Sequence, residues 1–210
     1  MKHIVQCVSG MVFLLGLQLA AASGSTEEGQ PAEMSPTESL FAGGRYEAAV
    51  TSGVLFSPFG PSRLRPTIDY TLSALQFGYM LGGVHGDGWW RGNFEVVGEA
   101  FGGRIFEGQG SYLAGGTAWL RYNFVPRNTS WLVPYLQGGV GAESIDVDRE
   151  IVGQAFNFNV SAGAGLRYFI SRNCSLNLEF RFQHISNANM APRNIGINAA
   201  GPMLGVSYFF

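Results

Sequence analysis

The chain has 210 residues, of which 46% are hydrophobic and only 13% are charged, about half the share of about 25% that is usual for soluble domains. Glycine accounts for 30 residues and aromatic side chains for 13%. This composition excludes disorder over most of the chain, because disordered segments are rich in charge and poor in rings. The net charge of −2 argues against nucleic acid as a partner, which needs a basic face. The length suits one domain.

The first 22 residues have the features of a secretory signal peptide. Lys2 and His3 give a basic start, Met11–Leu19 is an apolar stretch, and Ala20–Ala22 offers a small-residue cleavage site. A transmembrane anchor is the alternative, although polar residues interrupt the apolar stretch. Residues 23–44 are polar and contain Pro31 and Pro36. We therefore expect a signal peptide at 1–22, a flexible lead-in at 23–44 and one folded domain at 45–210.

From about Tyr46 onward, apolar residues recur at every second position, which is the pattern of β-strands. In residues 176–184, for example, the even positions are Leu, Leu, Phe, Phe and His, and the odd ones are Asn, Glu, Arg and Gln. The pattern predicts eight strands, at 46–57, 68–81, 93–101, 111–124, 132–143, 156–170, 175–186 and 203–210. A change of phase near Leu75 predicts a β-bulge there.

One face of these strands is apolar and the other carries charge. The charged positions are Glu47, Glu95, Glu99, Arg121, Glu143, Arg167, Glu179 and Arg181. A soluble barrel turns its apolar face inward, whereas a membrane barrel turns it toward lipid. The strand lengths and the aromatic residues near strand ends favour the membrane. The final aromatic strand resembles the C-terminal assembly signal of bacterial outer-membrane proteins. We expect an all-β, eight-stranded antiparallel transmembrane barrel with inward ion pairs; a lipocalin-like secreted barrel is the alternative.

Two residues at the end of strand 175–186 suggest chemistry. An even strand number places both termini on one side, so this strand runs outward and His184 and Ser186 lie at its outer end. By parity both side chains point toward lipid. Residues i and i+2 of a strand are about 6.6 Å apart at the backbone, twice the rise of about 3.3 Å. A histidine can therefore act as base for the serine hydroxyl, the arrangement used for acyl transfer. Alone, His-x-Ser is a weak motif.

The surrounding residues make the motif more specific. The stretches Phe182–Asn189 and Pro192–Asn198 resemble the PagL-type family of lipid A 3-O-deacylases. The resemblance implies a serine esterase of the bacterial outer membrane that removes the 3-hydroxyacyl chain at the 3-position of lipid A, without metal or cofactor. It further implies that His184 is the general base and Ser186 the nucleophile. Asn187 and Asn194 match asparagines associated with the oxyanion hole.

The resemblance also implies a Ser-His-Glu triad, and the chain departs from the family at the acid of this triad. Where a glutamate is expected, twelve residues after the serine, the chain has Asn198. Replacing a triad acid by asparagine costs about 10⁴ in rate in a serine protease. Three interpretations follow. Asn198 orients His184 in a slower enzyme, or a carboxylate of the loop before strand 156–170 (Asp146, Asp148 or Glu150) substitutes, or catalysis has been lost and lipid binding kept.

Other features leave further alternatives open. Arg193, in the expected outer loop, is a candidate for pairing with a phosphate or sugar of lipid A. The lipopolysaccharide of the outer leaflet is the expected partner, and a homodimer stays open. The alternative function is that of a catalytically weak or inactive small barrel with a structural or lipid-binding role.

Overall fold

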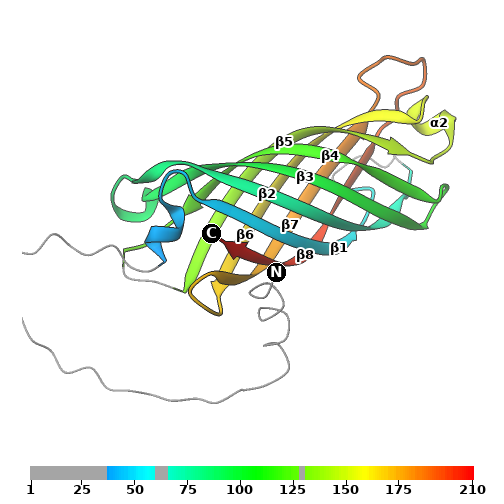
Figure 1. The fold of residues 1–210 in the computed structure, drawn as a ribbon. Helices are drawn as coiled ribbons and strands as arrows, with labels where there is room; N and C mark the ends of the chain where they lie inside the picture. The colour runs from blue at the N-terminus through cyan, green and yellow to red at the C-terminus, as the bar shows by residue number, and fades with distance from the viewer. Residues whose placement is uncertain (1–36, 60–65, 128–130) are drawn as a thin grey trace, which may run out of the picture.

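The computed structural model describes residues 37–59, 66–127 and 131–210, which form a closed antiparallel barrel (Figure 1). Each strand pairs with its neighbours in the sequence, and β1 pairs with β8 to close the barrel. The strands are β1 (Tyr46–Leu55), β2 (Asp69–His85), β3 (Gly92–Glu107), β4 (Tyr112–Phe124), β5 (Leu132–Ile145), β6 (Phe156–Phe169), β7 (Cys174–Ser186) and β8 (Ile197–Phe209). The prediction of an all-β, eight-stranded antiparallel barrel is confirmed.

Two ends of the barrel can be distinguished. Strand β1 begins and β8 ends at the end that we call the inner end (Figure 1). The opposite end, which we call the outer end, carries the short helix α2 (Arg149–Val152) in the β5–β6 loop. Strand β7 runs toward the outer end, so His184 and Ser186 lie there, as the strand count predicted.

Two sequence-based expectations about the strands are wrong. Strand β8 begins at Ile197 rather than at residue 203, because the small residues between Ile197 and Pro202 hide the period of two. The bulge expected near Leu75 is absent: Leu75 pairs in regular register with Val50 and Ala100. The register shifts of the β2–β3 pair lie instead at the two ends, between Asp69 and Tyr70 and between Leu81 and His85.

The interior of the barrel explains the apparent change of phase in β2. Tyr70, Leu72 and Ala74 are buried inside, like Gln76 on the same face of the strand. The inward face of β2 is therefore apolar near the outer end and polar toward the middle, without any shift in the backbone. These residues belong to an apolar cluster that fills the outer end, and which we call the outer cluster. Its members include Leu55, Phe101, Ile105, Leu113, Ile145, Ile151, Val152, Ile185, Ile197 and Met203.

The middle of the barrel holds the predicted ion pairs. Arg121 Nη1 lies 3.1 Å from Glu47 Oε2, and Arg181 Nη1 lies 3.0 Å from Glu99 Oε1. The other charged members are Arg167, Glu95 and Glu179. All seven side chains are buried. Buried charges are tolerated when they are paired and hydrogen-bonded, so this layer is a packed polar core.

A second apolar cluster fills the inner end. Phe41 is fully buried, and its ring packs against Phe169 and Phe209 at centroid distances of 6.1 and 5.6 Å. Phe41 ends the 3₁₀-helix η2 (Glu38–Phe41), whose Glu38 forms an ion pair with Arg91. These residues lie within the lead-in that was expected to be flexible; instead they pack into the barrel. The expected signal peptide and residues 23–36 lie outside the described residues.

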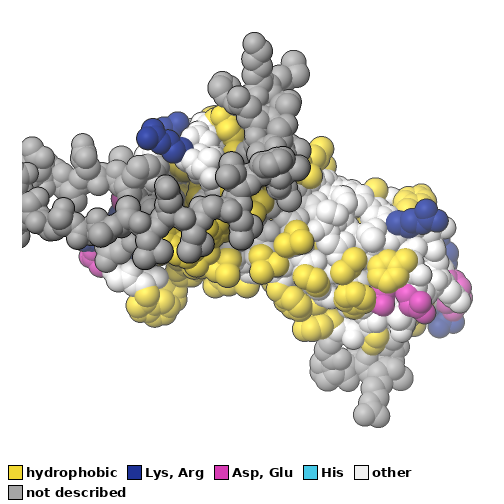
Figure 2. Space-filling view, turned by 90° about the horizontal axis from the view of Figure 1, so that it is seen from below, with side chains coloured by type: hydrophobic (Ala, Val, Ile, Leu, Met, Phe, Trp, Pro, Cys, Tyr) yellow, Lys and Arg dark blue, Asp and Glu magenta, His cyan; other side chains and the backbone are white. Residues whose placement is uncertain are grey.

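The outside of the barrel is apolar. Val50, Leu75 and Leu204 are 58 to 65% exposed, and Figure 2 shows hydrophobic side chains along the body of the barrel, with charged side chains near its ends. This is the arrangement of a barrel surrounded by lipid. In the part of the chain that the structure describes, no helix is long and apolar enough to cross a membrane.

Candidate active site

The alternation of β7 places the predicted base and nucleophile on the outside of the barrel. Gln183 and Ile185 are buried inside, whereas His184 and Ser186 are half-buried on the opposite, outward face. Ser186 lies opposite Phe158 in the pairing with β6. The side chains predicted as base and nucleophile are therefore two residues apart on the outward face of β7.

The residue across from His184 is Asn198. The two are register partners in the β7–β8 pairing, and His184 Nδ1 lies 2.6 Å from Asn198 Oδ1. When His184 carries its proton on Nδ1, it donates to the amide oxygen, and Nε2 keeps the lone pair that a general base needs. The amide thus lies where the resemblance predicts the triad acid.

The carboxylates considered as substitutes have other contacts. Asp148 Oδ1 accepts a hydrogen bond of 2.9 Å from the Glu150 backbone N–H, which caps helix α2. Glu150 Oε2 lies 3.2 Å from Arg193 Nη2. Asp146 is exposed. Of the candidates considered for the acid, the structure brings Asn198 to His184.

Asn187 and Asn194 lie together in the β7–β8 loop. The side chain of Asn187 is fully buried, and its Nδ2 donates to Val152 O at 2.9 Å and Arg193 O at 2.7 Å. The Asn187 backbone N–H donates to Asn194 Oδ1 at 3.1 Å, and Asn194 Nδ2 donates to Asn189 Oδ1 at 3.0 Å. Both asparagines hold the loop that follows Ser186.

Arg193 is in the outer loop, as expected. Its side chain is 65% exposed and is paired with Glu150, which is 71% exposed. An exposed ion pair of this kind contributes little to stability, so the guanidinium can exchange its partner for another anion.

Aromatic side chains lie next to the polar pair on the outer wall. Phe182 is the next outward residue of β7 before His184. The ring of Phe59, from the segment after β1, contacts the rings of Phe180 and Phe182 at centroid distances of 6.1 and 5.9 Å. Sequence reasoning missed Phe59, because it lies beyond the alternating stretch of β1 beside a proline.

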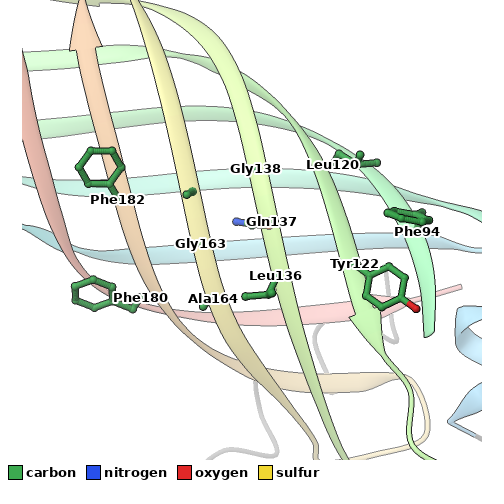
Figure 3. A pocket seen from close by; sticks show the side chains of 11 residues that line it. Phe94, Leu120, Tyr122, Leu136, Gln137, Gly138, Gly163, Ala164, Phe180 and Phe182 are labelled. Carbon is green, nitrogen blue, oxygen red and sulfur yellow. The ribbon is translucent and has the colours of Figure 1, made fainter. Parts of the chain in front are cut away.

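An apolar groove of about 510 Å³ begins at Phe182 and crosses the outer wall of the barrel. Its floor is open because small residues of neighbouring strands face each other: Gly138 of β5 is paired with Ala162 of β6. Figure 3 shows the aromatic rings of β7 on one side of the groove and side chains of β3 and β4 on the other. The labelled residues include Phe180, Phe182, Phe94, Leu120, Tyr122, Leu136 and Ala164.

Within residues 37–59, 66–127 and 131–210, no group of three or more His, Cys, Asp or Glu side chains is placed to hold a metal ion.

Fold and site together define a small barrel of the bacterial outer membrane with a polar pair on its lipid-facing wall. The family model of lipid A 3-O-deacylase (PagL) matches residues 69–207. The chain therefore belongs to the lipid A 3-O-deacylase (PagL) family, and the predicted resemblance and the outer-membrane location are confirmed.

Two solved structures share the fold. The crystal structure of the outer membrane enzyme PagL is 18% identical with a TM-score of 0.51, and the match covers 78% of this chain and 98% of that one. Neisserial surface protein A (NspA) is 17% identical with a TM-score of 0.57, covering 79% of this chain and 97% of that one. At these identities the likeness concerns the fold alone. No curated protein matches the chain.

Proposed function

We propose that the protein is an esterase that hydrolyses the ester-linked 3-hydroxyacyl chain at the 3-position of lipid A. The observation that carries the proposal is the contact of 2.6 Å between His184 Nδ1 and Asn198 Oδ1, on the lipid-facing wall two residues from Ser186. Membership of the lipid A 3-O-deacylase family supports the choice of substrate. The location supports it too, since lipid A surrounds this end of the barrel.

In the first half of the reaction, His184 Nε2 takes the proton of Ser186 Oγ, and Oγ attacks the ester carbonyl carbon. The tetrahedral oxyanion needs a donor, and we assign this role to the loop that contains Asn194. When the intermediate collapses, the bond between the acyl carbon and the sugar 3-oxygen breaks, and His184 protonates the leaving oxygen. The acyl chain is then an ester of Ser186.

In the second half, water gives a proton to His184 and attacks the same carbonyl carbon. Collapse returns the proton to Ser186 Oγ and releases the 3-hydroxy fatty acid. The apolar groove that begins at Phe182 offers hydrocarbon contacts beside this site. Arg193 is free to exchange Glu150 for a phosphate or sugar of the substrate.

With Asn198 in place of a carboxylate, the proposed reaction should be slower than with a complete triad. Its Oδ1 can accept the Nδ1–H of His184 and so fix the tautomer and the ring. The amide carries no negative charge, however, and it stabilises the imidazolium less than a carboxylate does.

The test is the mass spectrum of lipid A from cells that express the protein. The wild type should remove the mass of one 3-hydroxyacyl chain, and Ser186→Ala and His184→Ala should leave lipid A intact at equal amounts of folded barrel. Unchanged lipid A in wild-type cells would contradict the proposal. It would favour the second candidate, a non-catalytic lipid-binding barrel, for which the amide at Asn198 is the supporting observation.

A further inference from the structure

The side chain of Asn187 connects two outer loops. It is fully buried, and its Nδ2 donates to Val152 O, at the end of helix α2, and to Arg193 O, in the β7–β8 loop. An amide nitrogen has two N–H donors, and both are used by these carbonyls. The Asn187 side chain therefore has no donor left for an oxyanion.

The β5–β6 loop fits closely around this amide. Ile195 N–H donates to Ile151 O at 2.9 Å, and Ile151 and Val152 belong to the outer cluster inside the barrel. Gly153 follows them with a φ of +73°, and a Cβ there would lie 2.8 Å from Asn187 Nδ2 and 2.4 Å from Arg193 O. Helix α2 is thus anchored in the barrel on one side and bonded to the β7–β8 loop on the other.

We propose that Asn187 is a positioning residue: it fastens helix α2 to the β7–β8 loop and thereby fixes the backbone that presents Ser186. The inference rests on the proposed function, because it assigns Ser186 the role of nucleophile. Ser186 is the last residue of β7 and Asn187 is the first residue after it. Beyond Ser186 the chain has no strand pairing to fix its backbone. The buried side chain of Asn187 fixes it instead, through its hydrogen bonds to Val152 O and Arg193 O.

The experiment uses three variants of the full chain in detergent or liposomes. Asn187→Asp keeps the size of the side chain but replaces both donors by an oxygen that faces carbonyls. Gly153→Ala replaces no group of the proposed reaction, but its Cβ would press on Asn187 Nδ2 and Arg193 O and so push helix α2 and the β7–β8 loop apart. Asn173→Asp is the matched control, since Asn173 Nδ2 donates to Phe209 O at 2.8 Å in the turn at the inner end.

The readouts are the rate at which a fluorophosphonate labels Ser186, with loss of fluoride, and kcat and KM for lipid A. Misplacing a reacting group by about 1 Å can lower a rate about 100-fold. We expect Asn187→Asp and Gly153→Ala to lower kcat and the labelling rate about 10- to 100-fold, with KM and the final labelled fraction near those of the wild type. Asn173→Asp should label at the wild-type rate. A folding defect would instead lower the labelled fraction.

The two ways of failing are distinct. If the wild type is labelled and Ser186→Ala is not, but Asn187→Asp and Gly153→Ala are labelled as fast as the wild type, the positioning role is overturned and the proposed function stands. A loss of activity in Asn187→Asp with normal activity in Gly153→Ala would also overturn it. If wild-type Ser186 is not labelled and lipid A is unchanged, both the proposed function and the inference fail.

Discussion

His184 and Asn198 face each other across the β7–β8 pairing, with Nδ1 and Oδ1 2.6 Å apart. A neutral amide therefore stands where the family resemblance implies a glutamate. Because the contact is a single hydrogen bond on the outside of the barrel, its contribution to catalysis can be altered without touching the packed interior.

Substitution of Asn198 gives the most direct test of that contact. Asn198→Ala should lower kcat for lipid A at least about tenfold, because it removes the acceptor that fixes the His184 ring. Asn198→Glu should raise kcat above the wild type, by up to about 10⁴. Kinetics on purified lipid A in mixed micelles measure both. Wild-type kcat in Asn198→Ala would mean that another group orients the histidine.

Arg193 offers a test of substrate recognition. Arg193→Ala should lower kcat/KM on phosphorylated lipid A about tenfold, since a hydrogen bond to a charged group contributes about 1.5 kcal/mol or more. It should have a smaller effect on the dephosphorylated lipid. Glu150→Gln is the control, because it releases Arg193 from its ion pair without removing the guanidinium. Equal effects of Arg193→Ala on both lipids would exclude a phosphate contact.

Because the ion pairs in the middle of the barrel are buried, we expect a large loss of stability when one of their charges is removed. Arg167 is fully buried and contacts both Glu47 and Glu95. Arg167→Met should lower the free energy of unfolding by about 3–5 kcal/mol, because two buried carboxylates are then left with Arg121 as their shared ion-pair partner. Urea unfolding in liposomes measures the change. Arg127→Met is the control, since the Arg127–Asp87 pair is exposed; similar losses in both variants would contradict the buried layer.

The burial of Phe41 against Phe169 and Phe209 predicts that helix η2 is part of the folded domain. Phe41→Ala should destabilise the barrel by about 3–5 kcal/mol, as expected for deleting a buried ring, while kcat of the folded protein stays near that of the wild type. Urea unfolding in liposomes measures the loss of stability, and a deacylation assay on the folded protein measures kcat. Unchanged stability would mean that the segment before β1 contributes little to the fold.

Much of the fold follows from local pattern, but part of the site does not. The period of two predicted the strands and the outward direction of His184 and Ser186, because alternation fixes the face of every residue once one face is known. Asn198 was expected in a loop, since β8 was predicted to begin at residue 203. Its position opposite His184 depends on the register of two strands, which no local period encodes.

Other features escaped prediction for different reasons. The change of phase near Leu75 was interpreted as a bulge because a strand with apolar residues on both faces imitates a one-residue shift in the alternation. Asn187 donates to backbone carbonyls of the β5–β6 and β7–β8 loops. Every residue carries a backbone carbonyl, so the residue types do not indicate such partners. Leu40 and Phe41 are two neighbouring apolar residues in a mostly polar stretch, and so short a run does not indicate a buried segment.

The layered interior also limits what the protein can transport. A hydrated ion entering the barrel from either end would meet a cluster of buried apolar side chains. This is the outer cluster at one end and Phe41 with its aromatic neighbours at the other. Between the two clusters lie the buried ion pairs of Arg121, Arg167 and Arg181. We therefore expect no ion conduction along the axis, and the candidate site lies on the curved outer wall and its loops.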